Sequence, residues 1–81
     1  MMSINRHDVE SILDSVNRNL LQRSKTIKTE FRIDYAAQYG GWMIYYYDGS
    51  ARARCPLGNL RVTHKEAYRF FEGILFSLKS L

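Results

Sequence analysis

The segment Trp42–Tyr47 constrains the fold more than any other part of the sequence. Its residues are aromatic or aliphatic, and Asp48-Gly49 follows it directly. Such residues favour strands, and Asp-Gly is typical of a two-residue hairpin turn, in which both positions need positive φ. A half-buried strand alternates apolar and polar side chains, whereas this one is apolar on both faces. We therefore expect one face to enter the core and the other to be covered or to await a partner.

Helices are expected on either side of the strand region. In Arg6–Leu21, apolar residues recur at the spacing of one helical stripe, and Asn5 is a favourable N-cap. A second helix is expected at His64–Lys79, because Thr63 and Glu66 match a capping box. The two apolar stripes comprise Val9, Ile12, Leu13, Val16 and Leu20, then Ala67, Phe71, Ile74, Leu75 and Leu78.

Three strands are expected between these helices, at Thr29–Ala36, Trp42–Tyr47 and Ser50–Cys55. The first and third alternate polar and apolar residues, as half-buried strands do. Pro56 has no amide hydrogen, so it ends the third strand, and Leu57–Val62 is an irregular return to the second helix. These elements predict an α+β fold of order αβββα, a three-stranded antiparallel sheet with two helices packed on one face. With 81 residues, the chain is expected to form one small domain.

Cross-strand partners share one face of a sheet, so the register decides which side chains meet. With a two-residue turn at Asp48-Gly49, the pairs expected on the core face are Trp42–Cys55, Ile44–Ala53 and Tyr46–Ala51. The pairs expected on the opposite face are Met43–Arg54, Tyr45–Arg52 and Tyr47–Ser50. The pairs expected with the first strand are Tyr35–Trp42, Asp34–Met43 and Arg32–Tyr45, which also bring Phe31 and Ile33 to the core.

The face turned away from the core is the candidate partner-binding surface. Tyrosine, methionine and arginine are enriched where protein interfaces concentrate their binding energy. Alternatively, the arginine stems lie over the tyrosine rings and simply cover the sheet, and the residues alone leave both interpretations open. The predicted partner-binding residues are Arg32, Met43, Tyr45, Tyr47, Arg52 and Arg54.

The net charge of +4 arises from 12 lysines and arginines against 8 carboxylates. Such an excess permits nucleic-acid binding, although a solvated connector after the first helix explains most of it equally well. The residues that would grip phosphates in this alternative are Arg18, Arg23, Lys25, Lys28, Lys65 and Arg69. In a third alternative, the exposed sheet or the second helix, with Phe76, forms a homodimer.

The sequence contains no recognisable catalytic motif or phosphate-binding loop. His7 and His64 lie near opposite ends of the chain, and Cys55 has no partner at ligand spacing, so we expect no metal or cofactor. A single cysteine suits a reducing compartment, and no apolar run is long enough to span a membrane. We therefore expect a non-enzymatic cytoplasmic protein without membrane contact.

The expected αβββα order and the chain length resemble those of double-stranded-RNA-binding domains, whose second helix opens with lysines that bind phosphates. In His64–Arg69, only Lys65 and Arg69 correspond to those lysines, and Glu66 has the opposite charge. The Gly-Pro-x-His loop of the family is replaced by Gln38–Trp42. The resemblance therefore covers the topology and implies the RNA-binding alternative.

A second resemblance rests on Tyr39–Trp42 together with Lys65–Gly73. These segments look like a pattern in small uncharacterised proteins of gut phages, prophages and other mobile elements, and the pattern covers roughly the last half of the chain. The resemblance implies a phage-like accessory protein, and proteins of that kind often bind and block host machinery, including CRISPR effectors. The leading expectation is thus a small binding module that recognises a protein, such as a host defence factor.

Overall fold

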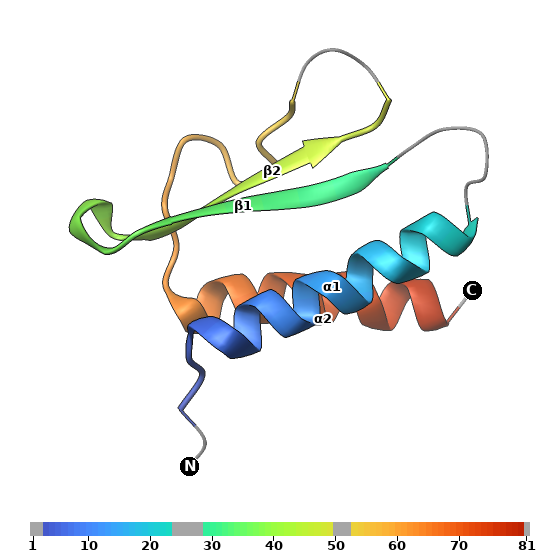
Figure 1. The fold of residues 1–81 in the computed structure, drawn as a ribbon, viewed down its shortest axis with the longest axis horizontal. Helices are drawn as coiled ribbons and strands as arrows, with labels where there is room; N and C mark the ends of the chain where they lie inside the picture. Colours follow the sequence, from blue (N-terminus) through green and yellow to red (C-terminus); the bar gives the residue numbers. More distant parts are fainter. Residues whose placement is uncertain (1–2, 24–28, 50–52, 81) are drawn as a thin grey trace.

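The computed structural model describes residues 3–23, 29–49 and 53–80. β1 and β2 form an antiparallel pair, and both helices lie on the same side of it and run in the same direction (Figure 1). α1 packs against β1 and α2 against β2. The α+β class and the placement of two helices on one face are thereby confirmed. In chain order, the elements are α1 (Arg6–Arg23), β1 (Glu30–Ala36), the 3-10 helix η1 (Ala37–Tyr39), β2 (Gly41–Tyr47) and α2 (His64–Lys79).

Both helices begin at reciprocal caps that the sequence predicts. The Asn5 side-chain oxygen accepts from the Asp8 amide at 3.0 Å, and the Asp8 carboxylate accepts from the Asn5 amide at 3.0 Å. At the start of α2, the Thr63 hydroxyl accepts from the Glu66 amide at 3.1 Å, and the Glu66 carboxylate accepts from the Thr63 amide at 3.0 Å. These bonds satisfy amides that have no partner within the helix. α2 has the expected bounds, and α1 continues past the expected end at Leu21.

The core lies between the helices and the strands. The Phe31 ring of β1 meets the Phe71 ring of α2 edge to face, with centroids 5.6 Å apart, and lies 4.8 Å from the Tyr46 ring. Burying an apolar side chain of this size stabilises a fold by roughly 1.5–3 kcal/mol. The predicted core face is thus confirmed for Trp42 and Ile44, which are both 2% exposed, while Tyr46 is half-buried. The buried core residues are Val9, Ile12, Val16, Phe31, Trp42, Ile44, Ala67 and Phe71.

The register between β1 and β2 is the predicted one. η1 joins the strands, and Gly40 after it and Gly41 at the start of β2 have φ angles of 97° and 122°. A Cβ on Gly41 would lie 2.3 Å from the Val62 carbonyl oxygen, so only glycine fits here. The confirmed pairs are Tyr35–Trp42, Asp34–Met43 and Arg32–Tyr45.

The expected tight turn at Asp48-Gly49 is wrong. A type I′ hairpin turn needs positive φ at both central positions, and Gly49 has a φ of 91° while Asp48 does not take a positive value. Instead, Tyr46 exchanges backbone hydrogen bonds of 2.7 and 2.9 Å with Arg54. Arg54 belongs to residues 53–62, which are called the returning chain below. The local preference of the dipeptide for a tight turn therefore did not decide the register of the returning chain.

The expected third strand is also wrong for the described residues, in which the sheet has two strands. Within the part of the returning chain that is described, Arg54 and Val62 each form one isolated bridge, to Tyr46 and Trp42 respectively. Alanine is depleted in strands, and Pro56 cannot donate to a ladder, so this segment gains little from longer pairing. Residues 50–52 lie outside the described ranges, and so do the expected pairs Tyr45–Arg52 and Tyr47–Ser50. The expected pair Tyr46–Ala51 also lies outside the described residues. The expected pairs Trp42–Cys55, Met43–Arg54 and Ile44–Ala53 are not formed.

Candidate functional site

The face of the sheet turned away from the helices is called the outer face below. Side chains alternate along a strand, so the residues between the core positions point to this side. In the described chain, no helix lies over it (Figure 1). Arg32 is exposed, and Met43, Tyr45 and Tyr47 are half-buried. The outer face comprises Glu30, Arg32 and Asp34 of β1, Met43, Tyr45 and Tyr47 of β2, and Arg61 beside β2.

Arg32 is held in place by two neighbours on the outer face. Its guanidinium donates to the Glu30 carboxylate at 2.8 and 3.1 Å. The same guanidinium lies 4.4 Å from the centroid of the Tyr47 ring, which is the diagonal neighbour and not the directly opposite residue, Tyr45. The hydrogen bond and the charge of Glu30 raise the pKa of Arg32 above its ordinary value. Arg32 therefore presents a fixed cation whose guanidinium lies over the Tyr47 ring and not over the directly opposite Tyr45 ring.

Arg61 is a functional candidate that the sequence did not indicate. Its guanidinium donates to the Asp34 carboxylate at 2.8 Å, to the Asp34 carbonyl at 3.1 Å and to the Gly41 carbonyl at 3.0 Å. Its side chain is only 18% exposed. Arg61 precedes the bridge residue Val62, so the bridge to Trp42 positions it on the outer face. The available signal in the sequence was the alternation of apolar and polar residues in Leu60-Arg61-Val62, before the second helix. This segment was too short to predict a strand.

Arg54 does not lie where the sequence predicts it. Arg54 is paired with Tyr46, so it is not opposite Met43, and its guanidinium meets the Asp48 carboxylate at 3.4 Å. Arg61 occupies the place beside Asp34 that was expected for Arg54. Arg52 lies outside the described residues. Of the predicted partner-binding residues, the structure brings together Arg32, Met43, Tyr45 and Tyr47.

The charges on and beside the outer face are balanced in pairs. Arg32 pairs with Glu30 at 2.8 Å, Arg61 with Asp34 at 2.8 Å, and Arg54 with Asp48 at 3.4 Å. The pairs of Arg32 and Arg54, whose side chains are exposed, contribute little to stability, about 0–1 kcal/mol each. The effect of the three pairs here is to surround three apolar or aromatic side chains with polar groups of both signs, which is the composition of many protein interfaces.

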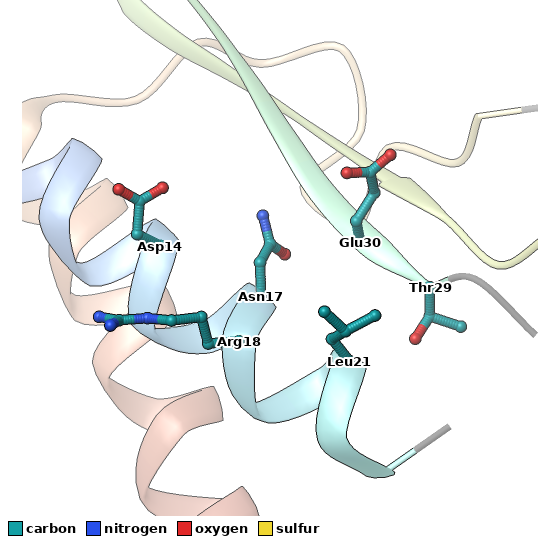
Figure 2. Close-up of a pocket in the computed structure, with 6 residues that line it drawn as sticks. All are labelled: Asp14, Asn17, Arg18, Leu21, Thr29 and Glu30. Carbon is teal, nitrogen blue, oxygen red and sulfur yellow. The ribbon is translucent and has the colours of Figure 1, made fainter. Parts of the chain in front are cut away.

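The described residues of the nucleic-acid alternative do not gather on one surface. Arg23 donates to the Leu78 carbonyl at the end of α2, whereas Lys65 and Arg69 belong to the first turns of that helix. Leu78 follows Lys65 by roughly 20 Å along the helix axis, at 1.5 Å per residue. Arg18 lies at the rim of a cavity of about 460 Å³ between α1 and β1, and it points away from Glu30 on the opposite wall (Figure 2). Lys25 and Lys28 lie outside the described residues.

His64 packs against two aromatic residues of the sheet, whereas His7 is exposed. The Trp42 indole donates to the His64 Nδ1 atom at 2.8 Å, and the Tyr35 ring stacks on the His64 ring with centroids 5.3 Å apart. Cys55 is a half-buried free thiol. Within residues 3–23, 29–49 and 53–80, no group of three or more His, Cys, Asp or Glu side chains could hold a metal ion. None of the described helices is long and apolar enough to cross a membrane.

The interpretation of the outer face therefore depends on its own geometry. The resemblances to double-stranded-RNA-binding domains and to phage accessory proteins stay predictions. No family model, curated protein or solved structure matches this chain.

Proposed function

We propose that this protein is a non-enzymatic binding module that holds another protein against its outer face. The observation that carries the proposal is an uncovered aromatic layer: Met43, Tyr45 and Tyr47 lie on the side of the sheet opposite both described helices. Tyrosine offers a large, amphipathic contact area and loses little side-chain freedom on binding. A strand in the middle of the fold holds these side chains in fixed positions, which lowers the entropic cost of binding further.

The balanced charge favours a protein over a nucleic acid as the partner. Phosphate binding requires cations that can replace condensed counterions. Each arginine on or beside the outer face in the described chain already has a carboxylate partner, so a phosphate would have to compete with Glu30, Asp34 or Asp48. A protein partner can instead accept both signs around a central aromatic contact.

The nature of the partner stays a prediction. The resemblance to phage accessory proteins favours a host protein, such as a defence factor, and the protein would then act as an inhibitor by occupying that factor's surface. Phe76, at 74% exposed on α2, is the residue that a homodimer would use instead. A single exposed aromatic residue is common on monomeric proteins, so the outer face is the stronger candidate.

The test is affinity capture from a lysate of the native host with matched double variants. Tyr45→Ala with Arg32→Ala removes one aromatic and one arginine side chain from the outer face. Phe76→Ala with Arg69→Ala removes the same kinds of side chain from α2, where both are exposed. Captured proteins and nucleic acids are identified by mass spectrometry and by sequencing.

We expect the outer-face variant to lose the captured protein and the α2 variant to keep it. Loss of one strong contact costs about 2 kcal/mol, roughly 30-fold in Kd. Loss of capture only in the α2 variant, or capture of nucleic acid with a steep salt dependence, would contradict the proposal. Urea unfolding of both variants confirms that each remains folded during the capture experiment.

A further inference from the structure

The free edge of β1 carries backbone groups that the fold leaves open. Trp42 and Tyr46 of β2 each exchange two backbone hydrogen bonds with the returning chain, at 2.7–2.9 Å. In an antiparallel ladder, successive residues direct their N–H and C=O groups to opposite sides. Even-numbered residues of β2 therefore bond away from β1, and the register makes Phe31, Ile33 and Tyr35 direct their backbone groups to the free edge of β1.

Helix α1 closes the first of these three positions. The Asn17 side chain donates to the Phe31 carbonyl at 2.9 Å and accepts from the Phe31 amide at 2.8 Å. This bond pair agrees with the direction deduced from the ladder. In the described ranges, no residue bonds to the outward N–H and C=O groups of Ile33 or Tyr35. Two donors and two acceptors thus remain in a row, and such an edge is a template for pairing with another strand.

A groove runs beside this open edge. It is a cavity of about 450 Å³, and its walls include one side of α1 and the edge residues of β1. The next cavity along the strand, drawn in Figure 2, shares Asp14 with it. The side chains that border the open edge are Arg6, Glu10, Leu13 and Asp14 of α1 and Ile33 and Tyr35 of β1.

We propose that the β1 edge binds an extended segment of a partner protein as an added strand, with a basic residue opposite Asp34 and apolar residues on either side. Asp34 lies on the outer face, so the residue opposite it lies there as well. Around the edge, Arg6 is paired with Glu10 at 3.2 Å and Asp34 with Arg61 at 2.8 Å, so the described lining carries one excess negative charge, that of Asp14. The Asp34 side chain is 59% exposed, so a cation of the added strand can share its carboxylate with Arg61. The flanking residues of the added strand would face α1, where Leu13 borders the groove. This proposal does not depend on the binding function of the outer face.

A second copy of the chain is a poorer occupant of the same edge. An antiparallel pair of β1 strands that uses Ile33 and Tyr35 in both copies sets Asp34 opposite Asp34 of the other copy. Like charges directly opposite one another destabilise a sheet. The alternative register, with Ile33 opposite Ile33, requires the backbone groups of Phe31, and Asn17 already holds them. Charge and geometry therefore favour a segment that differs from β1 and carries a cation.

The probes for this proposal are synthetic seven-residue peptides, acetylated and amidated, that alternate valine with lysine or valine with glutamate. Binding is followed by NMR titration of the Ile33 and Tyr35 amides in the full chain. We expect the lysine peptide to bind at least about fivefold more tightly than the glutamate peptide at low salt, given the usual strength of cross-strand charge pairs. We expect both amide signals to shift with a common Kd.

Backbone methylation tests the strand pairing itself. Valines opposite Ile33 and Tyr35 point their amides toward β1, whereas a lysine opposite Asp34 points its amide away. N-methylation of the valine amides should therefore abolish binding, and N-methylation of the lysine amides should leave it within about twofold. Equal effects of the two methylation patterns would overturn the proposal, as would the absence of any shift at Ile33 and Tyr35 at millimolar peptide.

Charge reversal supplies the matched variants. Asp34→Lys should reverse the preference in favour of the glutamate peptide, and Glu72→Lys, an exposed change of the same charge on α2, should not. Because Asp34 also pairs with Arg61, Asp14→Lys serves as a second variant on α1 if Asp34→Lys does not fold. An unchanged preference in the folded variant would contradict the proposed register. Protection of the Ile33 and Tyr35 amides that rises with protein concentration alone would assign the edge to a second copy instead.

Discussion

The two faces of β2 have similar compositions and opposite surroundings. On one face, Trp42 and Ile44 are 2% exposed and pack beneath the helices. On the other face, Met43, Tyr45 and Tyr47 are half-buried, and no described helix covers them. Packing in the core explains the apolar character of the first face.

The difference separates the apolar residues that pack in the core from those that no described helix covers. An ordinary two-layer fold places polar side chains on the solvent face of its sheet. Here, charged residues surround the outer face, and its centre is aromatic, as at a protein interface. Substitutions on the first face should therefore change stability, whereas those on the second should change binding.

The largest expected effect separates the two faces by stability. Ile44→Ala should lower the free energy of unfolding by about 2–5 kcal/mol, because it removes buried methyl groups and leaves a cavity. Tyr45→Ala should cost about 1 kcal/mol or less, since its ring is half-buried on a face without a helix. Urea unfolding of both variants measures the difference. A larger loss for Tyr45→Ala than for Ile44→Ala would reverse the assignment of the faces.

A smaller effect concerns the contact that places Arg61 on the outer face. Gly41→Ala introduces a Cβ 2.3 Å from the Val62 carbonyl at a φ of 122°, and it should cost at least about 2 kcal/mol. Gly58→Ala is the matched control, because its φ is 70° and its Cβ meets no atom within 4 Å. The control should cost about 1 kcal/mol. If thermal unfolding showed the same loss of stability for Gly41→Ala and Gly58→Ala, the close approach of Val62 to β2 would not stabilise the fold.

A further substitution tests how α1 holds the core strand β1. Asn17→Ala removes both side-chain bonds to the Phe31 backbone and should cost about 1–2 kcal/mol. Hydrogen exchange at the Phe31 amide should become faster, while Tyr45 on the outer face keeps its NMR signals. Asn17→Asp, which can accept from the Phe31 amide but cannot donate to its carbonyl when ionised, should give an intermediate loss. Unchanged exchange at Phe31 in Asn17→Ala would contradict the role of this side chain.

The smallest expected effect lies outside both faces, at the start of α2. The backbone and side-chain hydrogen bonds of Thr63 lower the pKa of Glu66 below its ordinary value of 4.5. The carboxylate therefore stabilises the fold at pH values above that ordinary value, and the contribution is lost as the pH falls through the lowered pKa. Glu66→Gln should flatten the acid limb of a plot of unfolding free energy against pH. If the unfolding free energy of Glu66→Gln fell as steeply at acid pH as that of the unchanged protein, the stabilising role of the Glu66 carboxylate would be contradicted.

The elements with local signals could be predicted from the sequence. The caps at Asn5 and Thr63 and the apolar stripes define both helices, because hydrogen bonds and packing within a few residues decide where a helix begins. The register of β1 and β2 could be predicted as well, by requiring Phe31, Ile33 and Tyr35 to share the buried face of Trp42 and Ile44.

The returning chain could not be predicted in the same way. Its position depends on the backbone angle of Asp48 and on the close approach of Val62 to Gly41, which involve residues far apart in the sequence. Because the turn at Asp48-Gly49 was predicted wrongly, the predicted partner of Met43 was wrong as well. Arg54 was therefore expected in the position that Arg61 occupies. The aromatic centre of the outer face was predictable together with Arg32 and Asp34, because β1 and β2 have local signals, whereas the place of Arg61 was not.

The most direct test of the central claim is the affinity of Tyr45→Ala for the captured partner protein, measured by calorimetry with folded protein. The outer face is proposed to bind and the core face to fold, so Kd should rise about 30-fold while the urea midpoint changes little. Phe76→Ala, an exposed aromatic change on α2, should leave Kd within about twofold. An unchanged Kd for Tyr45→Ala, in a variant that remains folded, would contradict the division of β2 into a folding face and a binding face.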